Sequence, residues 1–184
     1  MGQQDPFLAE AVILVDASTA FNSVNRAVLL HNIRVLCPEF STIAINMYRS
    51  PCRLFVGGTE ISSLEGTTQG DNLAMSLFAI GTLPVLRRLE SHNTVSQVWL
   101  ADDATGVGGL SALLDWWKDI IAEGTKYGYY VNEQKSCLIL KNPEDLDRAR
   151  EIFANTKIDI KLDGQRLVTR CITCPLFKHI GPSL

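Results

Sequence analysis

The alternation of hydrophobic and polar positions divides the chain into short strands and amphipathic helices. Residues 11–15, AVILV, form a continuous apolar run that stops at Asp16. Because the run is short and rich in β-branched residues, it predicts a strand covered on both faces, with Asp16 at its C-terminal end. Residues 29–36 and the apolar stripe within 40–48 predict two helices.

The middle of the chain predicts a hairpin followed by a helix. Two β-rich runs within residues 53–61 are joined by Gly57-Gly58, which is turn chemistry typical of a hairpin. The most apolar stretch, 74–86, predicts a buried helix that Pro84 kinks or restarts. This stretch is shorter than the ~20 residues that a membrane span needs, so we expect no membrane association.

A second hairpin carries two adjacent carboxylates. Strand-like runs at 95–100 and 104–107 enclose Asp102-Asp103, which places both acids at or near the turn. The elements after it are a helix capped by Ser111 and ended by Gly128, a strand at 136–140, a helix at 144–153 and an alternating strand at 158–162. The first of these helices is predicted from an apolar stripe of Leu113, Leu114, Trp117, Ile120 and Ile121.

This order of elements predicts an α+β domain with helices packed on one face of a largely antiparallel sheet. The chain has 184 residues, within the ~100–200 typical of one domain, and 46% of them are hydrophobic, enough to bury a core. Its formal net charge is -3. Because an independent nucleic-acid binder usually has a basic face, this charge fits a domain that holds metal ions while neighbouring domains grip the nucleic acid.

The five cysteines are expected to be reduced thiols. No charged N-terminal region precedes an apolar run, so we expect no secretion signal and an intracellular protein, cytoplasmic or nuclear. Cys171 and Cys174 form a single Cys-x-x-Cys with His179 nearby. One such pair without a second is weak evidence for zinc, so ordinary thiols are the favoured interpretation.

Asp16, Asp102 and Asp103 are the candidate chemical groups. Adjacent aspartates are common in turns for conformational reasons alone. A carboxylate that ends a buried strand is different, because it is half-buried and needs a partner. If the two segments are neighbours, three negative charges converge and a cation makes that tolerable. Hard oxygen ligands suit Mg²⁺, and two such ions about 3.5–4 Å apart can catalyse phosphoryl transfer.

Four segments then resemble, in order, the motifs of reverse transcriptases, especially those of mobile retroelements in invertebrates. Residues 15–26, VDASTAFNSVNR, resemble motif A, and residues 66–72, GTTQGDN, resemble motif B. Residues 100–103, LADD, resemble motif C, and residues 128–136 resemble motif D. Leu100 stands where motif C usually has an aromatic residue, and Asn72 replaces the usual proline of motif B.

The resemblance implies a role for each site residue. Asp16 and Asp102 would bridge two Mg²⁺ ions (Mn²⁺ as the alternative), with Asp103 as a supporting carboxylate. Lys135 would protonate or neutralise the departing pyrophosphate. Three sets of residues are expected to contact the substrate. The amides of Ala17, Ser18, Thr19 and Ala20 would face the triphosphate. The ring of Phe21 would exclude a 2′-hydroxyl, and Gln69 and Gly70 would lie at the nascent base pair.

The resemblance also predicts the domain organisation and the partners. Residues 1–162 would be the palm segment, and residues 163–184 a divergent tail in the place of the primer grip. The N-terminal part of the fingers and the thumb would be missing regions of a longer polyprotein. The partners would be an RNA or DNA template with its primer and deoxynucleoside triphosphates.

Three functions remain open at this point. The first is an RNA-directed DNA polymerase palm, whose isolated chain we expect to be inactive. The second is a catalytically silent, domesticated or decayed fragment that acts as a binding or interaction module. The third is a phosphohydrolase of the haloacid-dehalogenase type, since residues 13–16 end a strand with an aspartate; that family needs a second acid two residues later, where Ser18 stands.

Overall fold

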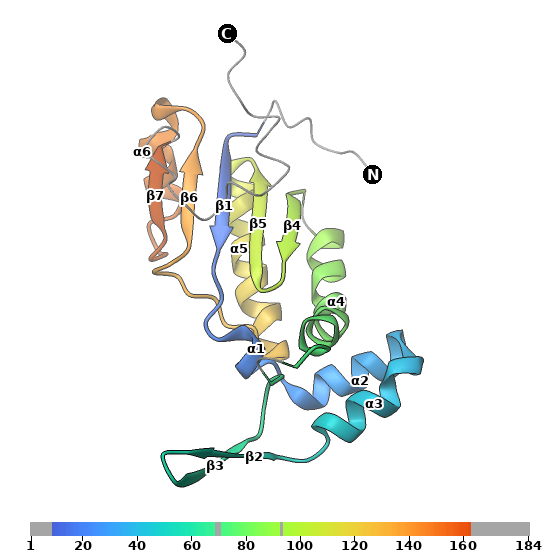
Figure 1. The fold of residues 1–184 in the computed structure, drawn as a ribbon. Coiled ribbons are helices and arrows are strands. Elements are labelled where there is room, and N and C mark those ends of the chain that lie inside the picture. Colours follow the sequence, from blue (N-terminus) through green and yellow to red (C-terminus); the bar gives the residue numbers. More distant parts are fainter. Residues whose placement is uncertain (1–8, 69–70, 93, 163–184) are drawn as a thin grey trace.

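A computed structural model of the chain describes residues 9–68, 71–92 and 94–162. Its centre is a five-stranded sheet with helices on one face (Figure 1). In spatial order the strands are β4 (Ser96–Leu100), β5 (Asp103–Gly108), β1 (Ala11–Val15), β6 (Cys137–Leu140) and β7 (Asp159–Leu162). The predicted α+β fold is therefore confirmed.

The sheet is antiparallel except at one edge. β1 pairs antiparallel with β5 on one side and with β6 on the other, and β4 and β5 form a hairpin. β6 and β7 are parallel. Their connection runs through a 3₁₀ turn at Pro143–Asp145 and helix α6 (Leu146–Ile152), because parallel neighbours require a crossover rather than a tight turn.

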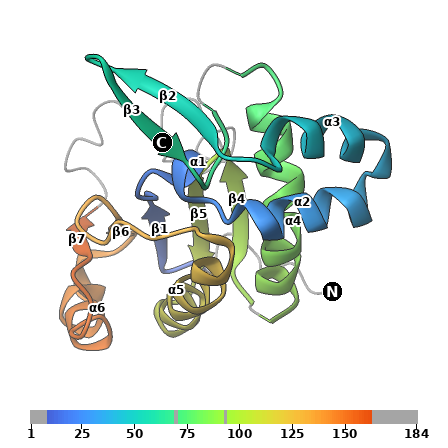
Figure 2. The same cartoon turned by 90° about the horizontal axis from the view of Figure 1, so that it is seen from below.

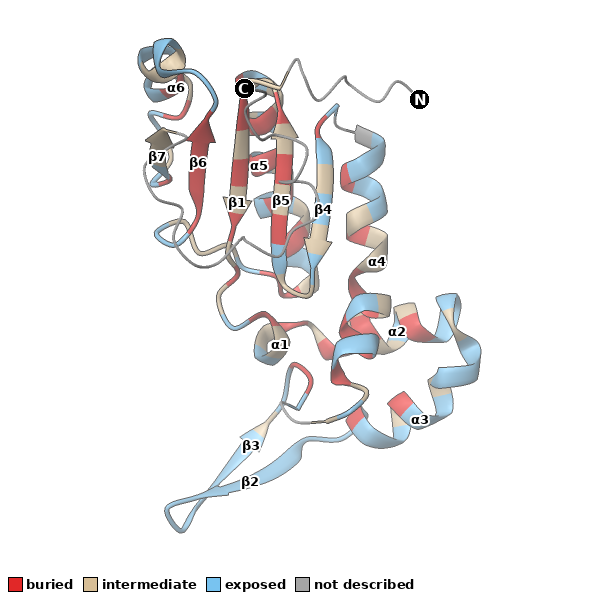
Figure 3. Ribbon diagram, turned by 45° about the horizontal axis from the view of Figure 1, so that its top comes forward, coloured by how far each residue is buried: buried red, intermediate tan, exposed pale blue. Residues whose placement is uncertain are grey.

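Burial along β1 corrects one expectation. Ala11, Ile13 and Val15 are buried, whereas Val12 and Leu14 between them are only partly buried (Figure 3). The strand is thus fully covered on one face and partly covered on the other. A continuous apolar run does not show this difference, because both faces of the strand are apolar.

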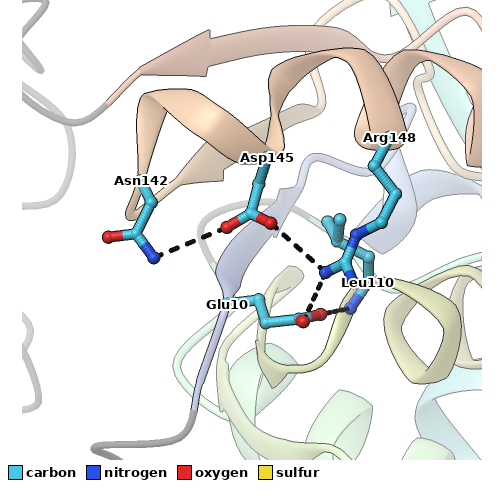
Figure 4. A network of polar contacts seen from close by, with 5 residues as sticks. All are labelled: Glu10, Leu110, Asn142, Asp145 and Arg148. Carbon is cyan, nitrogen blue, oxygen red and sulfur yellow. Dashed lines mark hydrogen bonds and ion pairs between the residues drawn. The ribbon is translucent and has the colours of Figure 1, made fainter.

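Helices α4 (Ala74–His92), α5 (Leu110–Gly124) and α6 lie along the same face of the sheet (Figure 2). α5 provides much of the core. Its N-cap is Gly109 rather than the predicted Ser111, and glycine has no side chain to cap the helix. The first amide, that of Leu110, donates instead to Glu10 Oε2 at 2.7 Å (Figure 4). The fully buried α5 side chains are Leu110, Leu113, Trp116 and Ile120, with Trp117 2% exposed.

Pro84 does not restart α4, which continues to His92. The helix has one buried face that includes Leu77, Val85 and Leu89, so the same packing surface extends on both sides of the proline. Asn32 Nδ2 also donates to Gly81 O at 2.7 Å, which links α2 to α4 close to the proline. Packing along this face outweighs the ~3 kcal/mol that an interior proline costs.

Residues 26–64 form what we call the lobe, which extends from one end of the sheet (Figures 1 and 2). It follows the short helix α1 (Ala20–Ser23). The hairpin turn at Gly57 and Gly58 has φ values of 56° and 82°, as a tight hairpin requires. The lobe consists of α2 (Arg26–Leu36), α3 (Pro38–Tyr48), β2 (Cys52–Val56), β3 (Thr59–Ser63) and Leu64.

No helix among the described residues is long and apolar enough to span a membrane. Cys37 and Cys52 are free thiols. Cys171, Cys174, His179 and the whole predicted tail 163–184 lie outside the described residues.

Candidate functional site

The strand register brings the two acidic segments to one end of the sheet. Val15 of β1 pairs with Ala104 of β5, and Leu100 of β4 pairs with Asp103. Continuing the antiparallel β1–β5 register by one residue sets Asp16 opposite Asp103, with Asp102 next to it in the β4–β5 turn. Asp16 and Asp102 are partly buried and Asp103 is exposed.

The hydroxyl of Tyr129 is influenced by all three carboxylates. Tyr129 is buried, and its Oη donates to the backbone oxygen of Asp102 at 2.7 Å. Burial raises the pKa of this hydroxyl far above its ordinary value, and the charges of Asp102, Asp103 and Asp16, in that order, raise it further. All three carboxylates are therefore near enough to Tyr129 to act on its hydroxyl electrostatically.

Backbone strain is concentrated at the same place. Thr19 and Ala101 have φ values of 51° and 58°, and they are the only non-glycine residues with positive φ in the part of the chain that the structure describes. Each costs roughly 1–2 kcal/mol relative to an ordinary conformation. Thr19 lies three residues after Asp16 and Ala101 directly precedes Asp102. Strain of this kind is often stored at functional sites.

The backbone of Asp16 is held by the segment 132–136. The Asn132 amide donates to Asp16 O at 2.8 Å, and the Asp16 amide donates to Ser136 Oγ at 3.1 Å. Ser136 is 1% exposed, and its hydroxyl donates in turn to Asn132 O at 2.8 Å. Lys135 Nζ lies 3.9 Å from Asp16 Oδ2. The predicted acid Lys135 is therefore beside the predicted metal ligand.

The amides predicted to face a triphosphate lie just beyond Asp16. Ala17 forms an isolated bridge with Val131, and the Ser18 amide donates to Tyr130 O at 2.7 Å. The Ser18 amide is thus engaged within the protein, which leaves Ala17, Thr19 and Ala20 for the predicted role. Thr19, with its positive φ, turns the chain into α1 at this point.

Phe21 is held in place from two sides. Its ring, which is partly buried, packs against that of Phe78 on α4, with the centroids 4.6 Å apart. Its carbonyl oxygen accepts from the Thr67 amide at 2.6 Å. This fixed position is what a steric gate requires, although a core aromatic residue would be held in the same way.

The segment that resembles motif B is anchored by Arg26, which is 6% exposed. Its guanidinium donates to the carbonyl oxygens of Ser63, Glu65 and Gly66 at 3.1, 2.9 and 3.1 Å. It also lies 5.4 Å from the centre of the Tyr48 ring. Arg26 is therefore a structural clamp at the base of the lobe.

Tyr48 extends this anchor toward the predicted base-pair contacts. Its hydroxyl donates to Asp71 Oδ2 and accepts from the Thr68 amide at 3.2 Å. Burial, followed by the bond to Asp71, raises the pKa of Tyr48. Gln69 and Gly70 themselves lie outside the described residues.

The donor set at the acidic end fits a hard divalent ion in its chemistry. Three carboxylates supply the oxygen ligands that Mg²⁺ prefers. Within the described residues, however, no three carboxylate, histidine or cysteine side chains already form a group that could hold a metal ion. Binding an ion would therefore require the aspartate side chains to rotate toward one another.

Sequence reasoning missed two polar residues of this site. Tyr129 and Ser136 were recognised only as letters of a motif, without a role. Each bonds to a segment distant in sequence: Tyr129 to Asp102, 27 residues away, and Ser136 to Asp16, 120 residues away. The resemblance to motif D was the only available signal, because it covers both residues.

The five-stranded α+β sheet with helices on one face and acids at one end is polymerase-like in its fold. The chain is similar to apo telomerase from Candida tropicalis, with a TM-score of 0.57 and 15% identity over 71% of this chain and 28% of that one. It is also similar to telomerase from the same organism in complex with a fragment of telomeric RNA, with a TM-score of 0.54 and 17% identity over 71% and 26% of the two chains.

These likenesses concern the fold, and the chain spans less than a third of the telomerase chains that it matches. No family model and no curated protein matches the chain. The predicted polymerase-like fold is confirmed, whereas origin in a retroelement stays a prediction.

Proposed function

We propose that this chain is the catalytic palm of an RNA-directed DNA polymerase of a retroelement, and that it adds deoxynucleotides to a primer 3′-hydroxyl. One observation carries the proposal: Asp16, Asp102 and Asp103, which come from two segments distant in sequence, lie at the same end of a polymerase-like sheet. The telomerase complex with telomeric RNA supports a nucleic-acid partner. Because the match covers only 28% of the telomerase chain, we propose that the template grip lies in flanking regions.

Each site residue has a separate role in the proposed reaction. Asp16 and Asp102 would hold the Mg²⁺ ions, with Asp103 in support, and the bound metal would supply charge stabilisation for phosphoryl transfer. Lys135, next to Asp16, supplies a proton or positive charge to the departing pyrophosphate. Phe21 excludes the 2′-hydroxyl of a ribonucleotide through its fixed ring.

The first test is metal binding. A ligand that binds only the folded state raises the free energy of unfolding and therefore the melting temperature. The gain is about 2.7 kcal/mol when the ligand concentration is 100 times the dissociation constant. Saturating Mg²⁺ or Mn²⁺ should therefore stabilise the wild type, and Asp16→Asn should abolish the response. Asp147→Asn is the matched control, because the Asp147 side chain is 98% exposed. An identical response of wild type and Asp16→Asn would refute the metal site.

The second test is primer extension. The chain alone should extend a primer negligibly, because positioning contributes as much as the metals do. A longer polypeptide that includes the flanking regions should extend it, and Phe21→Val should then admit ribonucleotides. Discrimination that is unaffected by this substitution would show that Phe21 is only a core residue.

A catalytically silent binding module is the second candidate. It is favoured by the absence of a preformed metal-holding group among the described residues. The melting experiment separates the two functions, since a silent module has no reason to respond to Mg²⁺ through Asp16.

A further inference from the structure

Tyr129 is a buried residue whose position is set by packing on two sides. Its side chain is 3% exposed, and its ring meets that of Trp99 edge-on, with the centroids 5.5 Å apart. On another side is Gly124, where an added Cβ would lie 3.1 Å from Tyr129 Cδ1. The ring is therefore held by α5 and by β4, in addition to the bond that its hydroxyl makes to the turn.

The hydroxyl is directed at the backbone of the acidic turn. It donates to Asp102 O at 2.7 Å. A buried hydroxyl needs a partner, and here the partner belongs to a proposed metal ligand rather than to a helix or to solvent.

The turn itself needs a restraint. Ala101, directly before Asp102, has a φ of 58°, a conformation that glycine adopts freely and alanine does not. Left alone, the turn would gain by relaxing to negative φ, and that relaxation would move Asp102 relative to Asp16. A hydrogen bond from a rigid ring to the next carbonyl oxygen opposes this movement.

We propose that Tyr129 is a positioning residue that holds the 101–102 turn in its strained conformation and thereby keeps the Asp102 carboxylate in reach of Asp16. The inference rests on the proposed function, because it concerns the same metal site. Tyr129 acts through the backbone and contacts neither the metal nor the substrate.

The test measures Mn²⁺ affinity of the full chain, from the electron paramagnetic resonance signal of free Mn²⁺, at a temperature where circular dichroism shows every variant to be folded. Tyr129→Phe removes the hydroxyl and keeps the ring. It should weaken Mn²⁺ binding about three- to tenfold, the factor expected for one lost hydrogen bond. Tyr127→Phe, at a partly buried tyrosine two residues away, should change the affinity less than about twofold.

A double variant separates positioning from general packing. Glycine at position 101 removes the strain that Tyr129 opposes, so Ala101→Gly should restore most of the affinity lost in Tyr129→Phe. Affinity of Tyr129→Phe within twofold of the wild type would overturn the inference. A loss that Ala101→Gly fails to relieve would overturn it too. Wild-type Mn²⁺ binding that is absent or insensitive to Asp16→Asn would instead overturn the proposed function.

Discussion

The sheet with its helices and the lobe of residues 26–64 bury their apolar side chains very differently. Among the residues that the structure describes, fifteen large apolar residues are exposed, and ten of them lie in the lobe, although the lobe is the smaller part. The β2–β3 hairpin is exposed along almost its whole length, with Phe55 70% and Val56 63% exposed. The sheet and its helices therefore stabilise themselves. The hairpin is stabilised mainly by its own pairing and by the clamp at its base.

The largest difference in the free energy of unfolding should come from replacing one aromatic residue in each region. Trp116→Ala, in the core, should lower the free energy of unfolding by about 3–5 kcal/mol. Phe55→Ala, at the exposed hairpin, should change it by less than about 0.5 kcal/mol. Urea denaturation followed by circular dichroism measures both. A comparable loss for Phe55→Ala would mean that the lobe has a core of its own.

Two glycines with similar backbone angles sharpen the comparison. Gly128 has a φ of 77°, and an added Cβ would lie 2.1 Å from Ser23 O, so Gly128→Ala should cost about 2–4 kcal/mol. Gly58 has a φ of 82° with nothing within 4 Å of the added atom. Gly58→Ala should cost only the conformational term, about 1 kcal/mol. Equal melting temperatures for the two variants would contradict the packing difference.

Arg26 tests the link between the two regions. Arg26→Met keeps an apolar stem but removes the donors to Ser63, Glu65 and Gly66, which should cost about 2 kcal/mol. Limited proteolysis should then cleave the lobe sooner than the rest of the chain. Arg49→Met, at an exposed arginine of the same lobe, is the control. Unchanged cleavage in Arg26→Met would show that the clamp is not needed.

The smallest effect on the free energy of unfolding should come from breaking two glutamate–arginine pairs, one in each region. In each region the arginine lowers the pKa of the glutamate: Arg148 that of Glu10, and Arg53 that of Glu60. Glu10 also accepts from the Leu110 amide, whereas the Arg53–Glu60 pair lies at the surface of the hairpin (Figure 4).

A lowered pKa in the folded state means that the stabilisation by Glu10 is present above about pH 4.5 and is lost as the pH falls through the folded value. Glu10→Gln should therefore reduce stability at neutral pH by less than about 1 kcal/mol, because the pair is partly exposed, and the difference should vanish once the pH is below the folded pKa of Glu10. Glu60→Gln should leave the pH profile of unfolding unchanged. A pH-dependent loss of stability that is larger for Glu60→Gln than for Glu10→Gln would show that the hairpin pair contributes more than the Glu10 pair.

Periodicity predicted the elements well but could not say what covers them. Of the predicted apolar stripe on α3, Ala44 and Tyr48 are buried, whereas Phe40, Ile43 and Met47 are each more than a third exposed. On α5 the predicted stripe included Ile121, which is 37% exposed, and left out Trp116, which is fully buried. An apolar periodicity identifies which side of a helix is apolar. How much of that side is buried depends on the elements that pack against it.

The acidic site was predictable in its position and not in its support. An acid after a buried strand and two acids at a hairpin turn share one end of the sheet once the strands pair, and this follows from the pattern. The bonds from Tyr129 and Ser136 go to backbone atoms of distant segments, which leaves no local pattern in the sequence. Strain at Ala101 is likewise a property of the folded turn.

The central position of β1 determines where the chain tolerates a change in length. Ile13 pairs with Gly106 on one side and with Leu138 on the other. Because side chains alternate along a strand, one residue inserted between Ala11 and Asp16 would exchange the two faces and move Asp16 out of step with Asp103. At Gly57-Gly58 extra residues would extend into solvent. Insertions and deletions among relatives of this chain should therefore accumulate at the hairpin and be absent from the strand that ends at Asp16.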